Sequence, residues 1–217
     1  MAEKAAVKGP QELWELENAL YQEGYVAVCG CDEAGAGPLA GPVYAAAVIL
    51  PRGLELPWLN DSKLVTEKRR DILFDQIREK ALSYAVASVP AAEIDELDIL
   101  NARMKAMQLA IDALPVQPDF ALIDGNRDHG SRCAIITDHE TVVKGDSRSA
   151  SIAAASILAK VSRDRYMLEM AEMYPQYCFE KHKGYGTKLH YEMLDRFGPS
   201  PIHRVSFLAK WEAKRRG

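Results

Sequence analysis

The sequence has no long apolar run. Its 217 residues contain no stretch of 18 or more consecutive apolar residues, which is about the length that a membrane-spanning helix needs. The opening stretch, MAEKAAVKGPQELWELENAL, has neither the apolar core nor the small-residue cleavage site of a secretory signal. These absences predict a protein that neither enters a membrane nor is exported.

Cysteine is scarce, and its spacing does not match a zinc site. The four cysteines are Cys29, Cys31, Cys133 and Cys178. No histidine stands at ligand spacing from the close pair. Scattered cysteines of this kind are typical of free thiols in a reducing compartment, so we expect a cytoplasmic protein.

An excess of positive charge is also lacking, because the net charge is −4. This argues against a generally basic protein that coats nucleic acid. The distribution is uneven, however: residues 181–217 hold nine Lys and Arg against three acids, a charge of +6, which leaves −10 for the rest. That asymmetry suits an anionic partner at one end and cations at the other, although a solvated basic terminal helix would give the same pattern.

The periodicity of apolar residues predicts a mixed α/β domain, without repeats or low-complexity tracts. We expect strands at 25–31, 43–51, 83–90 and 119–125, with a fifth at either 134–138 or 140–146. We expect helices at 11–23, after the cap Thr66, and at 92–114, 151–174, 187–197 and 207–216. The first three strands favour antiparallel pairing, and the later ones can join in parallel through the helix at 92–114.

Acidic residues stand where these apolar runs end. Asp32 and Glu33 follow the first predicted strand, Asp124 ends the fourth, and Asp146 follows the fifth. Ligands of open α/β sheets gather at strand ends, so the four carboxylates can converge there. Grouped carboxylates need protons or cations, and oxygen-only ligands favour Mg²⁺ or Mn²⁺. The alternative is that each Asp is a turn residue or a helix cap, and spacing alone leaves both interpretations open.

Asp32 and Glu33 raise a geometric question. Successive side chains of a strand point to opposite faces, so we expect the chain to bend if both are to share one site. Gly35 and Gly37 permit such a bend, and they also let a ligand approach the backbone.

Seven motifs occur in an order that resembles bacterial ribonuclease HII, the type 2 ribonuclease H. They are CDEAGAGPLAGPV, LNDSK, LIDGN, KGD, SIAAASILAKVSRDR, HKGYGT and FGPSPIHRVSF, and together they extend from about residue 25 to 207. The resemblance implies a ribonuclease H-like fold: a five-stranded mixed sheet flanked by helices, with a helical C-terminal extension. We therefore expect one catalytic domain over residues 1–217, with about 181–217 as its basic helical part.

The resemblance also implies an activity. Such enzymes hydrolyse the RNA strand of RNA/DNA hybrids and nick duplex DNA on the 5′ side of an embedded ribonucleotide. They leave a 3′-hydroxyl and a 5′-phosphate. Carried over by motif, Asp32, Glu33, Asp124 and Asp146 would bind two Mg²⁺ or Mn²⁺ ions, with Asp32 bridging them. We expect the protein to act as a monomer on these nucleic acids.

Recognition of the 2′-hydroxyl is implied for two segments. The backbone of Gly35, Ala36 and Gly37 would contact the hydroxyl that distinguishes RNA from DNA. Tyr185 would contact the same hydroxyl and pack on the adjacent deoxyribose, although by itself a tyrosine between glycines is more often a packing residue.

Candidate phosphate contacts are less specific. They are Lys63, Ser156, Lys183 and Lys188. Lysines are often only solvated, and a serine within a helix often only packs, so each has a structural alternative. We regard His182 and His203 as structural or peripheral, since the acids already supply oxygen ligands.

The chain departs from the family pattern at two positions. Ala36 stands where the family usually has Arg, and Leu64 follows Lys63 where a second lysine is common. Losing the arginine removes a possible bidentate phosphate contact but leaves the backbone donors intact. We expect hydroxyl recognition to survive while affinity or rate falls. The rival hypotheses are another nuclease of this fold, which would cut all-DNA duplexes, and a catalytically silent hybrid-binding protein.

Overall fold

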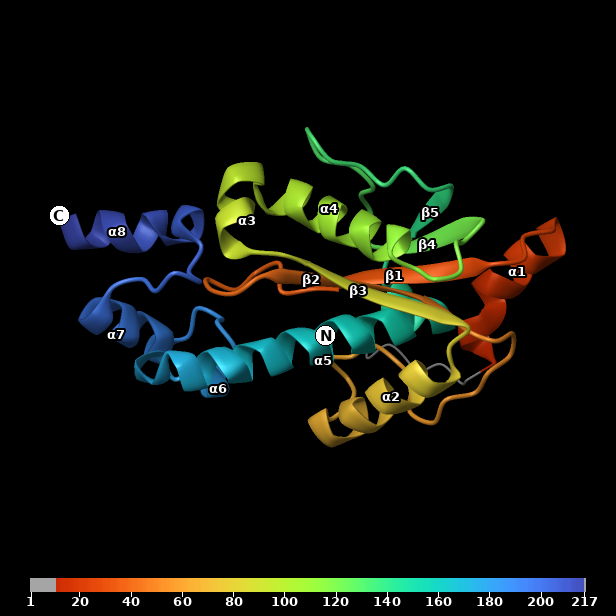
Figure 1. The fold of residues 1–217 in the computed structure, drawn as a ribbon, viewed down its shortest axis with the longest axis horizontal. Helices are drawn as coiled ribbons and strands as arrows, with labels where there is room; N and C mark the ends of the chain where they lie inside the picture. The colour runs from red at the N-terminus through yellow and green to blue at the C-terminus, as the bar shows by residue number, and fades with distance from the viewer. Residues whose placement is uncertain (1–10, 217) are drawn as a thin grey trace, which may run out of the picture.

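A five-stranded mixed β-sheet forms the middle of the protein (Figure 1). The computed structural model describes residues 11–216; residues 1–10, which include part of the stretch searched for a secretory signal, and residue 217 lie outside that range. The sheet order is β3-β2-β1-β4-β5, in which β1 to β3 pair antiparallel while β4 pairs in parallel with both β1 and β5. The strands are β1 Val28–Ala34, β2 Val43–Ile49, β3 Ser83–Val89, β4 Phe120–Asp124 and β5 His139–Val142. This topology confirms the predicted fold class.

Helices cover both faces of the sheet (Figure 1). α4 (Ile99–Asp112) packs on one face, and α5 (Ala150–Met173) packs on the other with α2 (Glu67–Lys80) beside it. Residues of β2 alternate between the two cores: Ala46 faces α5, whereas Ala45 faces α4. This alternation is the normal consequence of the pleat, and it decides which helix each side chain of the sheet meets.

The first half of α5 lies very close to β1. A Cβ atom at Gly30 would come within 2.1 Å of the carbonyl carbon of Ser151, so a side chain cannot fit at this point of the strand. Ala153, Ala154 and Ala155 are fully buried in the same region. Small residues on α5 therefore permit its close contact with the sheet, as the sequence predicted.

Two predicted elements were wrong in their bounds, and the structure decides between the two positions expected for the fifth strand. β1 begins three residues later than expected and continues through Ala34, so the acids Asp32 and Glu33 lie within the strand. The single helix expected at 92–114 is two helices, α3 (Ala91–Leu97) and α4, because Asp98 between them adopts a φ of 72°. β5 overlaps the second alternative, 140–146, whereas residues 134–138 form no strand and Ala134 makes only an isolated bridge.

The remaining helices agree closely with the expected positions. A short 3-10 helix (Glu12–Trp14) leads into α1 (Glu15–Glu23), which ends at the left-handed Gly24. α2 follows Thr66, whose side chain makes no capping hydrogen bond despite its N-cap position. No helix within residues 11–216 is long and apolar enough to cross a membrane.

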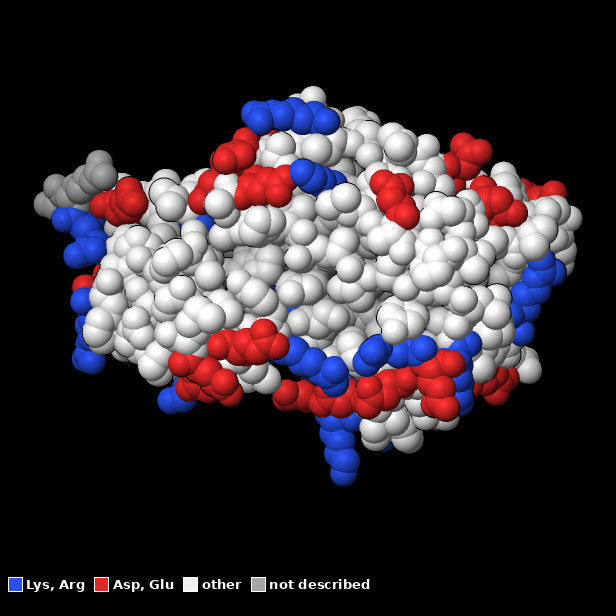
Figure 2. Space-filling view, viewed as in Figure 1, with Lys and Arg blue, Asp and Glu red and all other residues white. Residues whose placement is uncertain are grey.

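The C-terminal part packs against the far end of α5 (Figure 1). It contains α6 (Phe179–His182), α7 (Lys188–Phe197) and α8 (Ala209–Arg216), with a 3-10 helix (Val205–Leu208) before α8. Lys and Arg side chains appear at this end of the molecule in Figure 2, near the C-terminus. The part predicted to be basic and helical is thus folded onto the main sheet-and-helix layers.

Candidate active site

Asp32 and Glu33 point to opposite faces of the sheet. β1 stays paired with β2 through both residues and through Ala34, so the expected bend at the acid pair is absent. Asp32 is buried on the α5 side, where Ser156 donates to its carboxylate. Glu33 lies on the α4 side, where its Oε1 is 2.7 Å from Nη2 of Arg103. The chain turns only after the strand, at Gly35 with a φ of +95°.

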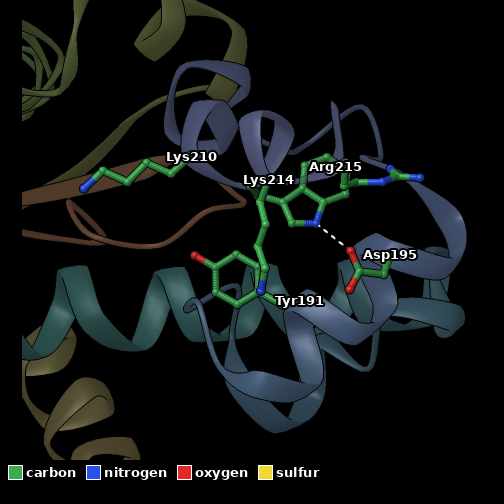
Figure 3. Close-up of a pocket in the computed structure, with 6 residues that line it drawn as sticks. Tyr191, Asp195, Lys210, Lys214 and Arg215 are labelled. Atoms are coloured by element: carbon green, nitrogen blue, oxygen red, sulfur yellow. Dashed lines mark hydrogen bonds between the residues drawn. The ribbon is translucent and has the colours of Figure 1, made fainter. Parts of the chain in front are cut away.

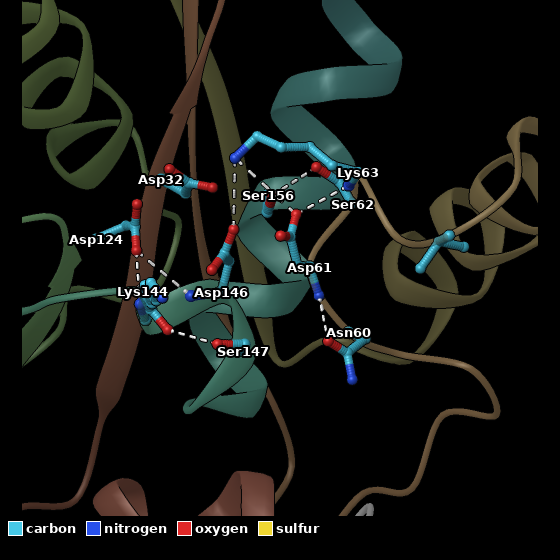
Figure 4. Close-up of polar contacts among 12 residues, drawn as sticks. Asp32, Asn60, Asp61, Ser62, Lys63, Asp124, Lys144, Asp146, Ser147 and Ser156 are labelled. Atoms are coloured by element: carbon cyan, nitrogen blue, oxygen red, sulfur yellow. Dashed lines mark hydrogen bonds and ion pairs between the residues drawn. The ribbon is translucent and has the colours of Figure 1, made fainter. Parts of the chain in front are cut away.

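Asp124 and Asp146 come from the neighbouring part of the sheet. Asp124 ends β4, the parallel neighbour of β1, and its Oδ1 accepts hydrogen bonds from the backbone N of Gly145 (2.7 Å) and of Asp146 (3.4 Å). Asp146 is buried in a short 3-10 helix, Gly145–Ser147, between β5 and α5. These bonds attach the loop after β5 to the end of β4, which brings the two acids together (Figure 4).

Negative charge accumulates at this end of the sheet. Burial raises the pKa of Asp32 well above its usual value, and the nearby Glu33 and Asp124 raise it further. The pKa of Glu33 is also raised, by burial, although Arg103 opposes the shift. For Asp146, burial together with neighbouring acids raises the pKa to about 6. Such shifts mean that the site gains from taking up protons or a cation.

One lysine partly balances these acids. Lys63 places its Nζ 3.7 Å from Oδ2 of Asp146 and 4.0 Å from Oδ1 of Asp61 (Figure 4). Its side chain is 79% exposed, so the contact is screened by water and contributes little to stability. Asp61 is a fifth acid at this site that the sequence motif LNDSK contained and that we did not single out.

The donor chemistry of these acids fits a hard divalent cation. All their ligating atoms are carboxylate oxygens, and their raised pKa values reflect a local excess of negative charge. Among residues 11–216, however, no three His, Cys, Asp or Glu side chains form a ready coordination group. Glu33 is held by Arg103, and Asp124 by backbone N–H groups. Metal binding would therefore require some of these carboxylates to turn.

A cavity of about 230 Å³ opens beside the acids. Its lining comes from the end of β1, the turn after it, the loop before α2, α5 and the C-terminal part. The lining residues are Asp32, Glu33, Ala34, Gly35, Ala36, Gly37, Ser62, Lys63, Ser156, Lys160 and Tyr185. The cavity thus joins Asp32, Glu33 and the glycine-flanked turn with Tyr185, which lies far from them in the sequence.

Two of the predicted phosphate contacts lie elsewhere. Lys183 donates to the carbonyl oxygen of Glu180, and Lys188 lies 3.8 Å from Glu192 on the exposed side of α7. Neither lysine lines the cavity, whereas Lys63 and Ser156 do. The hydroxyls of Ser156 and Ser62 are hydrogen-bonded at 2.8 Å, which links α5 to the loop carrying Lys63.

A larger hollow of about 460 Å³ lies between α7 and α8 (Figure 3). Among the described residues that line it, the only acid is Asp195, which accepts a hydrogen bond from Nε1 of Trp211 at 2.8 Å. The other lining side chains are Tyr191, Lys210, Lys214 and Arg215. Because one hydrogen-bonded carboxylate cannot supply a multi-oxygen metal site, the smaller cavity is the candidate active site.

Two buried arginines hold the turn and its surroundings. Arg204 donates to the carbonyl oxygens of Gly35 (2.6 Å), Ala36 (2.9 Å) and Gly41 (2.9 Å). Arg163, on α5, donates to other carbonyl oxygens, and its guanidinium carbon lies 5.6 Å from the ring centre of Tyr185. Both arginines belong to motifs that carried the family resemblance, but their sequence context gave no sign that they were buried.

Only glycine fits at position 35, for two reasons. Its φ of +95° is a conformation that residues with a side chain rarely adopt, and an added Cβ would come 2.1 Å from Nε of Arg163.

Arg103, which forms the ion pair with Glu33, was missed in the sequence, because nothing in the predicted helix at 92–114 distinguished it from a solvated arginine.

The comparisons with known proteins agree with this geometry. The family model described as Ribonuclease HII matches residues 29–210. A Ribonuclease HII of Endomicrobium trichonymphae is 55% identical over 90% of this chain and 91% of its own length. A Ribonuclease HII of Caldicellulosiruptor bescii is 49% identical over 91% of this chain and 94% of its own length. The crystal structure of the ribonuclease H2 from Pyrococcus horikoshii matches with a TM-score of 0.73 at 24% identity, covering 88% of this chain and 99% of that one.

Proposed function

The chain belongs to the ribonuclease HII family, and from this premise we propose that Asp32, Glu33, Asp124 and Asp146 are its catalytic, metal-binding residues. The protein is a metal-dependent endoribonuclease that acts on RNA/DNA hybrids and on embedded ribonucleotides. The observation that carries the assignment of the site is the cavity in which Asp32 and Glu33 meet the turn at Gly35–Gly37 and Tyr185.

We propose that the four carboxylates hold two Mg²⁺ or Mn²⁺ ions, with Asp32 shared between them. The raised pKa values of Asp32, Glu33 and Asp146 support this, because a site with excess negative charge gains most from a dication. When bound, the ions supply an activated water and stabilise negative charge on the departing 3′ oxygen. The burial of Asp32 between Glu33 and Asp124 supports its central position.

We propose Lys63 and Ser156 as the phosphate contacts. Both line the cavity, and Lys63 has an exposed side chain beside Asp146 that can swing from this carboxylate to a phosphate oxygen. Lys183 and Lys188 remain weaker candidates, because they lie outside the cavity. A lysine that contacts phosphate releases counterions, so its removal should reduce the salt dependence of binding.

The turn at Gly35–Gly37 and Tyr185 are proposed to recognise the ribonucleotide. With the carbonyl oxygens of Gly35 and Ala36 bound to Arg204, the N–H groups of the turn become its donors toward a ligand. Tyr185 is 44% exposed at the same cavity, which leaves its ring free to pack on a sugar. Ala36 supplies only a methyl group, so we propose that affinity or rate is lower than with arginine at this position.

A duplex DNA with one ribonucleotide tests this function. Incubated with Mg²⁺, the protein should nick the strand on the 5′ side of the ribose, and EDTA should stop the reaction. An all-DNA duplex of the same sequence should stay intact; its cleavage would favour another nuclease of this fold. Binding of a hybrid without any cleavage would favour a catalytically silent protein. Cleavage by Asp124→Asn at the wild-type rate would show that the site is misassigned.

We also propose that the protein acts as a monomer in the cytoplasm. All four cysteines are free in the structure, which suits a reducing compartment. Sedimentation of the protein with and without a hybrid duplex would test the oligomeric state.

A further inference from the structure

Three histidines form a buried cluster in the C-terminal part, outside the acid site. His182 and His190 stack with ring centres 4.3 Å apart, and Nε2 of His190 lies 2.9 Å from Nε2 of His203. Their exposed fractions are 7%, 0% and 3% in chain order. Phe179 packs against all three rings. The sequence singled out only His182 and His203, as structural or peripheral residues, and gave no sign of the cluster.

Backbone partners fix where the protons of this cluster lie. The backbone N–H of Ser200 reaches Nδ1 of His203 at 2.8 Å, so this nitrogen must accept. The carbonyl oxygen of Tyr185 lies 3.0 Å from Nδ1 of His190, so this nitrogen must donate. In the neutral tautomers that result, the Nε2–H of His203 donates to the bare Nε2 of His190. The proton positions required at His203 and at His190 agree with each other. They give a continuous series of hydrogen bonds from Ser200 through both histidines to Tyr185.

His182 completes the arrangement from the other side of Tyr185. Its Nδ1 accepts from the backbone N–H of Gly184 at 3.2 Å, and its Nε2 therefore donates to the carbonyl oxygen of Tyr177 at 2.9 Å. Thr187 adds a backbone N–H to the carbonyl oxygen of Tyr185 at 2.8 Å. The backbone N–H of Tyr185 itself donates to the carbonyl oxygen of His182 at 2.9 Å. The peptide groups on both sides of the Tyr185 side chain are thus fixed, while the ring itself stays 44% exposed at the cavity.

The hydrogen bonds of this cluster require all three imidazole rings to be neutral. A second proton on His190 would face the Nε2–H of His203, and one on His182 would face the N–H of Gly184. Burial and the neighbouring histidines lower the pKa of His190 and of His203 to about 4, and burial lowers that of His182 as well. All three rings are therefore neutral near pH 7.

We propose that His190 and His203, with His182 stacked on them, are positioning residues that fix the backbone of Tyr185 for recognition of the ribose–deoxyribose junction. This rests on the proposed role of Tyr185 in substrate recognition. The histidines touch neither the cavity nor the acids; they act by holding a main-chain segment in one conformation. Breaking this series of hydrogen bonds should reduce the selectivity for a single ribonucleotide over a continuous hybrid. The reason is that a continuous hybrid presents no ribose–deoxyribose junction at most of its cleavage sites.

A pair of substitutions at His190 separates positioning from general packing. In His190→Asn the amide nitrogen takes the place of Nδ1 and can still donate to Tyr185, whereas in His190→Gln the amide takes the place of Nε2 and that bond is lost. The measured quantity is kcat/KM on a single-ribonucleotide duplex divided by kcat/KM on a continuous RNA/DNA hybrid. We expect His190→Gln to lower this ratio about fivefold, the effect of one hydrogen bond, and His190→Asn to change it less than about twofold.

A further measurement does not depend on how well the variants fold. In the wild-type protein, ¹⁵N NMR of the imidazoles should show the proton on Nδ1 of His190 and on Nε2 of His182 and His203. A proton on Nε2 of His190 would overturn the proposal. Tyr185→Ala is assayed in parallel: if it keeps the wild-type ratio, the proposed role of Tyr185 fails. If Tyr185→Ala loses selectivity while folded His190→Gln keeps it, the positioning role of the histidines fails.

Discussion

Arg204 donates a hydrogen bond from Nη2 to the carbonyl oxygen of Gly35 at 2.6 Å, although its side chain is completely buried. Its other two bonds also go to carbonyl oxygens, those of Ala36 and Gly41. Among residues 11–216 no carboxylate forms an ion pair with it within 4.0 Å. A buried cation without an acid is costly unless dipoles surround it, so these carbonyls and Arg204 stabilise one another. The loop before α8 thereby determines the conformation of the turn beside the acids.

Replacing Arg204 with lysine should lower both the stability and the activity of the enzyme, because it disturbs this turn. An ammonium group cannot reach three carbonyl oxygens in the fork geometry of a guanidinium, so at least one buried oxygen loses its partner. We expect Arg204→Lys to lower the free energy of unfolding by roughly 2 kcal/mol and to reduce cleavage at a single ribonucleotide more than binding of the duplex. Urea unfolding and steady-state kinetics would measure the two effects. Arg196→Lys, at an exposed position of α7, serves as the matched control. Equal kinetics for both variants would contradict the role of Arg204.

Introducing an arginine at position 36 should raise the catalytic efficiency of the enzyme. A guanidinium beside the turn at Gly35–Gly37 can make a charge-assisted contact with a phosphate, worth about 1.5–3 kcal/mol. We expect Ala36→Arg to raise kcat/KM on a single-ribonucleotide duplex about tenfold and to steepen its salt dependence by about one counterion. Ala36→Met controls for side-chain volume without charge. Unchanged kcat, KM and salt dependence in the arginine variant would show that this side chain does not matter.

The strands, the antiparallel pairing of the first three and the presence of acids near strand ends were predictable because they follow from local patterns. Apolar runs bounded by turn residues predicted the strands, and acids at their ends predicted a charged edge of the sheet. The sequence could not show that β1 continues past its apolar run through Asp32 and Glu33, because these acids are paired within the sheet by backbone hydrogen bonds to β2. The break at Asp98 was hidden for a related reason: a helical apolar pattern continues across it.

The partners of the site were harder to predict, since they come from distant parts of the chain. Arg204 lies 169 residues after Gly35, and Arg103 holds Glu33 from another helix. Nothing local distinguishes a buried arginine from a solvated one. His190 was missed for the same reason, because its partner His203 follows only after α7 ends. Tertiary packing, rather than propensity, assigns these residues their roles.

Removing one acid should make the metal-free protein more stable while abolishing its activity. Asp32 is buried beside Glu33 and Asp124, which raises its pKa and indicates that its charge is unfavourable without a cation. In Asp32→Asn the amide oxygen can still accept from the backbone N–H of Glu33, which Asp32 binds at 2.7 Å. We expect a gain of about 1 kcal/mol in EDTA at pH 7 and a loss of activity of more than about 100-fold with Mg²⁺. Thermal unfolding in EDTA and the cleavage assay would measure both. A lower melting temperature than wild type in EDTA would contradict the view that repulsion dominates the empty site.

Acid should destabilise the protein through its histidine cluster. The pKa of His203 and of His190 is about 4 in the folded state, below the value of about 6.5 for an unfolded histidine. Between these pH values the unfolded chain binds more protons than the folded one, so stability increases with pH in this window and is lost as pH falls from about 6.5 to 4. Each such histidine contributes at most about 1.4 kcal/mol per pH unit. We therefore expect the melting temperature of His203→Gln to fall less steeply than that of wild type over this range. The acids of the site titrate in both proteins and cancel in the comparison, and parallel curves would show that His203 is not held neutral by the fold.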